Sequence, residues 1–152
     1  MSDIDTTHRR LDTLSILADD KQRAPIVLAS TAAITQKTIS RHAFVSSSHT
    51  LHRHQAIDLD DTMQRWRRMG YQFEAGAFAP GFASRRGGIL DIYPLGASMP
   101  ARLELWGSEI NSIRLFDPST QRSTAMVDSI NVVPAKETLP ALADLDNLNA
   151  LK

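Results

Sequence analysis

The 152-residue sequence contains no cysteine. This absence excludes a disulfide scaffold, a cysteine-ligated zinc site, an iron–sulfur cluster and a thiol nucleophile. The sequence also lacks any run close to the about 18 apolar residues of a membrane-spanning helix, and its polar start, Met1 to Arg10, lacks the apolar stretch of a signal peptide. We therefore expect a cytoplasmic protein with no membrane partner.

Neither sign of charge is in excess, because 17 Lys and Arg residues balance 17 Asp and Glu residues. No global positive charge can supply nonspecific affinity for nucleic acid, so a DNA or RNA role would depend on a local patch. The hydrophobic share of 42% and the charged share of 22% are those of an ordinary globular domain. The length predicts one domain, or one domain plus part of another.

The N-terminal part combines a polar tail, Met1 to Thr7, with a short amphipathic helix between Arg9 and Asp20. After Pro25, the apolar run Ile26 to Ala29 is typical of a strand that is buried on both faces of an α/β sheet. Since it is the only run of this kind, its sheet is not in this chain. We therefore expect about the first 45 residues to belong to a neighbouring domain.

A polar segment rich in Ser and His, 46–54, predicts a loop or linker. Asp58 then has the character of a helix N-cap, and Gly70 that of a C-terminal cap. Between them, one apolar stripe and one basic face are expected. The stripe comprises Leu59, Met63, Trp66 and Met69, and the basic face comprises Arg65, Arg67 and Arg68.

From Tyr71 to Val133 the apolar residues alternate with polar ones, and turn residues separate the short runs. Consecutive strands with short connections pair antiparallel. The predicted fold class is therefore α+β: a twisted antiparallel sheet, with the helix 58–69 packed on it through Met63 and Trp66. In the tail, 138–152, leucines three residues apart favour a helix.

Signatures of common active sites are missing. No GxxxxGK[ST] loop occurs, and Gly87 and Gly88 are not followed by the lysine and helix of a phosphate cradle, so we expect neither ATP binding nor a cofactor. No GxSxG motif orders a catalytic serine. His49, His52 and His54 could converge on a metal, but no carboxylate or cysteine completes the set, and a loop explains them better. The sequence predicts a protein that is not an enzyme.

The segment 80–116 is the most informative. Arg85 and Arg86 precede two glycines, and Arg102 and Trp106 alternate with leucines along a later strand. With the leucines in the core, Arg102 and Trp106 would be exposed together, as in a protein-binding hot spot. Alternatively, Trp106 covers a helix and Arg102 pairs with Glu104 or Glu109. Composition alone leaves both interpretations open.

Two strings in this segment carry a family resemblance: GGILDIYP at 87–94 and PARLELWGSEINSIRLFDPSTQRS at 100–123. They resemble the N-terminal region of the bacterial transcription-repair coupling factors, the Mfd family, whose pattern runs approximately RGGILDIFP and then P-x-R-[IL]-E-[FL]-[FW]-G-D-E-I. The excision-nuclease subunit UvrB, with RGDVxEIFP, is the poorer match. The resemblance covers roughly residues 9 to 137.

This resemblance implies that residues 51–137 form a domain that binds UvrA and that residues 1–50 are a fragment of an adjoining, degenerate helicase-like α/β domain. Its implied role is to recruit UvrA to stalled-polymerase sites in nucleotide excision repair. The family's UvrA-contacting positions correspond to Arg86, Arg102 and Trp106, with Arg85 as an additional candidate. ATP-driven translocation, and contacts with DNA and RNA polymerase, belong to the full-length family proteins.

The chain departs from the family pattern at Phe82, where the aromatic is displaced by one position, and at Ser108 and Asn111, where the family has acidic residues. An alternative function is a DNA-contacting accessory domain. Its phosphate-binding stripe would comprise Arg65, Arg67, Arg68, Arg85 and Arg86.

Overall fold

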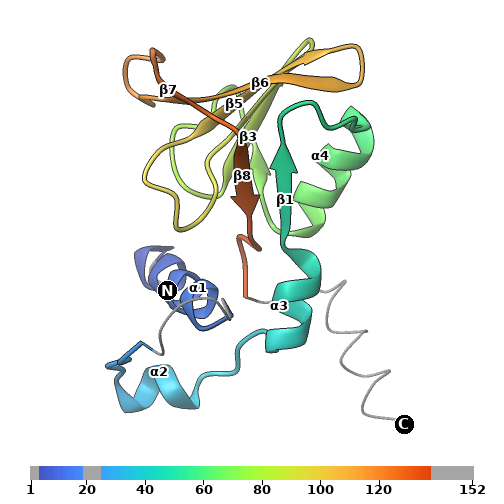
Figure 1. The fold of residues 1–152 in the computed structure, drawn as a ribbon. Coiled ribbons are helices and arrows are strands. Elements are labelled where there is room, and N and C mark those ends of the chain that lie inside the picture. Colours follow the sequence, from blue (N-terminus) through green and yellow to red (C-terminus); the bar gives the residue numbers. More distant parts are fainter. Residues whose placement is uncertain (1–3, 19–24, 138–152) are drawn as a thin grey trace, which may run out of the picture.

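The computed structural model describes residues 4–18 and 25–137. The helices are α1 (Ile4–Ala18), α2 (Thr31–Thr35), α3 (Arg41–Ser47) and α4 (Leu59–Arg68). The strands are β1 (His49–His52), β2 (Gln72–Phe73), β3 (Phe82–Arg86), β4 (Ile89–Ile92), β5 (Ala101–Trp106), β6 (Glu109–Phe116), β7 (Ser123–Val127) and β8 (Ser129–Val132). Helices α1 to α3 lie at one end of the molecule, and the sheets with α4 lie at the other (Figure 1). None of the described helices is long and apolar enough to cross a membrane.

Six strands form the main sheet in the order β2-β3-β4-β5-β6-β7, and every neighbouring pair is antiparallel except the short parallel pair β2–β3. The predicted α+β class is confirmed. The single antiparallel set expected from Tyr71 to Val133 is corrected in two respects: β2 runs parallel to β3, and β8 leaves the sheet to pair with β1.

Strand β1 lies where a loop was expected, so that expectation was wrong. Of its four residues only Leu51 is buried, and Leu51 faces Ile130 of β8 across the two-stranded sheet. A strand that buries a single side chain shows no alternation in its sequence. The polar residues around Leu51 therefore concealed the strand.

Helix α4 forms as its sequence predicts. The Asp58 carboxylate caps its N-terminus by accepting a hydrogen bond from the Asp61 backbone N–H at 2.9 Å. Gly70 follows with φ +92°, a conformation that glycine adopts without strain. Met63 and Trp66 are buried in the core shared with the sheet, so the predicted packing of this helix is confirmed.

A β-bulge at Asn111 shapes the hairpin of β5 and β6. Glu104 pairs with Ser112 and Leu105 pairs with Ile110, which leaves Asn111 without a partner across the hairpin. The extra residue lets Ile110 and Ile113, three positions apart, both enter the core. It also changes the register just before Trp106.

The N-terminal region differs from its prediction. Helix α1 begins at Ile4, inside the expected polar tail, and buries Leu11. Ile26 to Ala29 form no strand; Ile26 and Leu28 are 94% and 95% exposed. Within the described residues no strand lies beside this segment to pair with its backbone. The segment therefore does not form the strand that its sequence favours. The helix expected at 138–152 lies outside the described residues.

Candidate protein-interaction surface

One face of the main sheet carries the predicted site. Residues that face each other in an antiparallel pair lie on the same side of a sheet. The register therefore places Asp91, Arg102 and Arg114 in one row, and Arg86 and Glu104 in the next. The other face carries Leu90, Leu103 and Ile113, which lie in the core with the buried residues of α4. We call the first side the polar face.

Asp91 is the centre of this face. It lies on β4, between β3 and β5, and is only 2% exposed. Arg102 donates two hydrogen bonds to it, from Nε to Oδ1 at 2.7 Å and from Nη2 to Oδ2 at 2.8 Å. Arg86 donates a third, from Nη2 to Oδ2 at 3.0 Å. One carboxylate thus holds two guanidinium groups, one of them in the bidentate geometry that arginine favours.

Arg102 is enclosed by further contacts. Its Nη2 also donates to Gln121 Oε1 at 3.0 Å, and its guanidinium lies 4.5 Å from the centre of the Phe116 ring. Its side chain is 15% exposed. Hydrogen bonding to Asp91 raises the pKa of Arg102 above its usual value, so it is charged at any physiological pH. The expectation that Arg102 and Trp106 are exposed together is therefore wrong for Arg102, and its partner is Asp91 rather than Glu104 or Glu109.

Gln121 is a site residue that the sequence did not reveal. It follows a turn in which the Asp117 carboxylate accepts hydrogen bonds from the Ser119 hydroxyl and from the backbone N–H groups of Thr120 and Ser119, and these bonds lower the pKa of Asp117. The left-handed φ of +61° at Gln121 directs the chain back toward β7. The DPSTQR string, 117–122, is thus a loop that brings the side-chain amide of Gln121 to Arg102.

Trp106 is 83% exposed at the end of β5, as one of the two interpretations predicted. Glu109 faces it across the hairpin, and Glu109 Oε1 lies 3.0 Å from Nδ1 of His54. His54 has φ +65° and belongs to the connection between β1 and α4. Two segments far apart in the sequence therefore meet at Glu109, opposite Trp106.

Arg85 does not lie beside Arg86. It faces Leu90, on the opposite side of the sheet from the polar face, and its Nη1 forms an ion pair with Asp60 of α4 at 2.8 Å. Consecutive residues of a strand point to opposite faces. The structure thus separates Arg85 from Arg86, Arg102 and Trp106.

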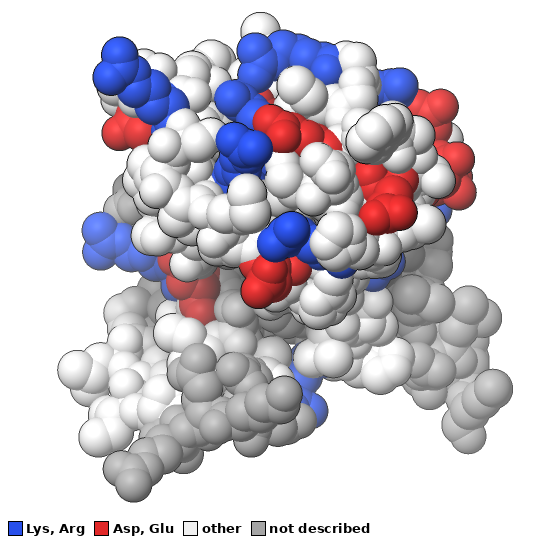
Figure 2. All heavy atoms as spheres, turned by 45° about the horizontal axis from the view of Figure 1, so that its top comes forward, with Lys and Arg blue, Asp and Glu red and all other residues white. Residues whose placement is uncertain are grey.

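The basic face of α4 is exposed, as predicted, and each of its arginines has a local contact. Arg65 donates to the carbonyl of Ser47 at 3.1 Å, Arg67 lies 4.3 Å over the Phe73 ring, and Arg68 contacts Gln64. Figure 2, which brings the sheet end of the molecule forward, shows basic side chains next to acidic ones on the face that it presents. The five arginines of the DNA hypothesis therefore do not share one side of the molecule, because Arg86 lies on the polar face.

The histidines do not converge on a metal. Among the described residues no group of three potential metal ligands occurs. His49 Nε2 instead accepts a hydrogen bond from Trp66 Nε1 at 3.2 Å, and burial, aided by the positive charge of Arg65, lowers the pKa of His49 to about 4. His49 therefore joins β1 to α4 in its neutral form.

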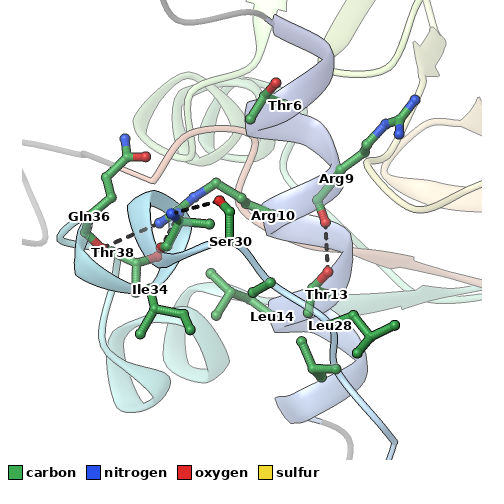
Figure 3. A pocket seen from close by; sticks show the side chains of 13 residues that line it. Thr6, Arg9, Arg10, Thr13, Leu14, Leu28, Ser30, Ile34, Gln36 and Thr38 are labelled. Atoms are coloured by element: carbon green, nitrogen blue, oxygen red, sulfur yellow. Dashed lines mark hydrogen bonds between the residues drawn. The ribbon is translucent and has the colours of Figure 1, made fainter.

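A cavity of about 650 Å³ lies between α1 and residues 27–38, away from the polar face (Figure 3). Arg10 lies in its wall and donates to the carbonyls of Ala33 at 2.6 Å and Gln36 at 3.5 Å, and to the Glu137 carboxylate at 2.6 Å. Since these partners occupy its guanidinium, Arg10 stabilises the fold here. None of the predicted site residues lines this cavity.

Together, the fold and the polar face define a small α+β domain with an arginine and tryptophan surface suited to contact with another protein. Residues 50–137 match the family described as the UvrB interaction domain, and the chain belongs to that family. A transcription-repair-coupling factor of Bacillus subtilis is 39% identical over 131 residues, which are 86% of this chain and 11% of that protein. Those of Staphylococcus aureus and Myxococcus xanthus are 34% and 33% identical over 84% and 77% of this chain. The chain thus spans about a tenth of the length of these relatives.

Proposed function

We propose that this chain is the UvrA-binding module of a transcription-repair coupling factor and that it recruits UvrA to stalled RNA polymerase in nucleotide excision repair. Membership of the interaction-domain family and the names of the relatives support this role. The role is binding rather than catalysis. ATP-driven translocation and contacts with DNA and RNA polymerase would fall to other parts of the full-length protein.

The single observation that carries the proposal is the exposure of Trp106. An indole left 83% exposed beside charged groups is costly in water and becomes favourable when a partner covers it. It shares the hairpin β5–β6 with the row of Arg102 and Arg114. Large aromatic residues next to arginines are the usual anchors of protein interfaces.

The test is titration calorimetry of the chain against purified UvrA. Trp106→Ala should weaken binding roughly 30-fold to nearly 1000-fold, about 2 to 4 kcal/mol, because the anchor is lost. Its melting temperature should stay close to that of the parent, since the side chain packs on little of the fold. Phe78→Ala is the matched control: Phe78 is also an exposed aromatic, but it lies in the loop between β2 and β3.

Equal losses of affinity for both variants, or none for Trp106→Ala, would place the UvrA surface elsewhere.

The salt dependence of binding separates the proposal from DNA binding. For phosphate contacts, the logarithm of the binding constant falls with the logarithm of the salt concentration, with a slope of about −0.9 per neutralised phosphate. The five arginines in that hypothesis do not form one stripe, because Arg85 pairs with Asp60 of α4 while Arg86 lies on the polar face. We therefore expect no measurable duplex binding at physiological salt.

We also propose that residues 1–50 are a fragment of an adjoining, degenerate helicase-like α/β domain of the longer protein, with Ile26 to Ala29 as a strand of its sheet, while 51–137 form the UvrA-binding domain. The almost complete exposure of Ile26 and Leu28 supports this proposal, since apolar side chains of this size normally find cover.

A further inference from the structure

The geometry of the polar face points to Asp91 as a positioning residue for UvrA docking, one that holds the Arg86 guanidinium ready for the partner. This inference rests on the proposed function and adds a residue to it. Asp91 itself is 2% exposed, so it cannot form a substantial contact with a partner protein. Any effect of Asp91 on binding must pass through the side chains that it holds.

The two arginines differ in how much of each is left for a partner. Arg102 uses Nε and Nη2 on Asp91 and Gln121, covers the Phe116 ring and is 15% exposed. Arg86 donates to Asp91 through Nη2 and is 56% exposed. Arg86 is therefore the member of the pair that presents N–H groups outward, while Arg102 fixes the carboxylate to which Arg86 is bound.

An arginine side chain loses rotamer freedom when a complex forms, and a residue that is already held loses less. Asp91 supplies this restraint, because Arg102 binds both oxygens of its carboxylate and so fixes its orientation. The charges agree with this arrangement. Two guanidinium groups against one carboxylate leave one positive charge on the cluster, which suits a single acidic group on the partner.

Asp91→Asn tests the inference, because it keeps the shape of the side chain and removes its charge. We expect UvrA binding to weaken roughly 10-fold to 100-fold. In an Arg86→Ala background the same change should have almost no further effect, whereas in a Trp106→Ala background it should have its full effect. If Asp91 served only the stability of the fold, Asp91→Asn would cause the same loss of UvrA affinity in both backgrounds. The double-mutant cycle therefore distinguishes a positioning role from a purely structural one.

A second measurement needs no partner. In the free parent chain, ¹⁵N relaxation at Arg86 Nε should report an ordered side chain, and Asp91→Asn should make it mobile. Asp128→Asn is the matched control, since Asp128 pairs with Arg53 at the end of the two-stranded sheet and is itself exposed. It should change neither UvrA binding nor the order of Arg86.

The outcomes distinguish this inference from the proposed function. If the parent chain does not bind UvrA, the proposed function fails and the inference fails with it. Two results would overturn only the inference while the parent still binds UvrA. In one, Asp91→Asn binds UvrA as tightly as the parent; in the other, Asp91→Asn weakens binding as much in the Arg86→Ala background as it does in the parent. A mobile Arg86 in the parent also overturns it, and this result is obtained even if Asp91→Asn does not fold.

Discussion

Arg102 and Arg86 contact the same carboxylate, yet they differ in how much each contributes to the stability of the fold. Two of the three hydrogen bonds to Asp91 come from Arg102, and Phe116 and Gln121 enclose its guanidinium. Removing Arg102 would leave the buried Asp91 carboxylate unhydrated and bound only by Arg86. The family resemblance marks Arg102 as a binding residue, but its surroundings give it a structural role first.

We therefore expect Arg102→Ala to lower the free energy of unfolding by roughly 2 to 4 kcal/mol, because Asp91 keeps only its bond to Arg86. Urea denaturation measures this change. Arg114→Ala is the control: Arg114 lies in the same row, is more exposed, and its ion pair with Glu104 spans 3.8 Å. That change should cost less than about 1 kcal/mol. Similar midpoints for the two variants would show that Arg102 does not support the sheet.

At the scale of elements, a side-chain hydrogen bond links the two-stranded sheet to α4. His49 of β1 accepts a hydrogen bond from Trp66 of α4, and only the neutral ring can accept one at that nitrogen. Burial and the nearby Arg65 lower the pKa of His49 from 6.5 to about 4. The link is therefore intact at neutral pH and broken in acid.

The pH dependence of stability follows from this shift. Between pH 6.5 and about 4 the unfolded chain takes up a proton at His49 that the folded chain excludes. The contribution of His49 to the free energy of unfolding is thus fully present above pH 6.5 and is lost as the pH falls toward 4. The difference in unfolding free energy between the parent and His49→Gln, which cannot titrate, should shrink over this range. A difference that stays constant from pH 7 to pH 4 would contradict the expected shift.

Elements whose burial follows one period could be predicted from the sequence. Helix α4 and most of the main sheet are of this kind, since their apolar residues recur at helical spacing or alternate. Strand β1 could not be predicted, because it buries only Leu51. The bulge at Asn111 was equally hidden, since it depends on how two strands pair and not on either strand alone.

The same limit applies to the site. The exposure of Trp106 followed from alternation along one strand, and so did the side of the sheet that it occupies with Arg102. The burial of Arg102 did not, because Asp91 lies on the neighbouring strand and Gln121 lies in a loop beyond the next one. Alternation gives the face of a residue, but only the register gives its partners.

At the scale of the whole molecule, Arg10 joins parts of the chain that are 127 residues apart. It connects α1 to α2 through the Ala33 carbonyl and to the end of the described chain through Glu137. Both side chains of this ion pair are largely buried. Together with the buried Leu11, the pair holds the N-terminal helices against the interaction domain.

Glu137→Gln should therefore loosen α1 without disturbing the sheet. Arg10 would keep its two carbonyl partners but lose its counter-charge, and local opening is governed by such contacts rather than by global stability. We expect amide hydrogen exchange in α1 to accelerate roughly 10-fold to 100-fold, while exchange in β4 and β5 stays unchanged. Glu74→Gln, at an exposed position just after β2, is the control that removes a charge without this contact. Faster exchange in α1 and in the sheet alike would instead mean that the N-terminal helices and the interaction domain unfold as one cooperative unit, because the loss of one contact between them would then lower the stability of both.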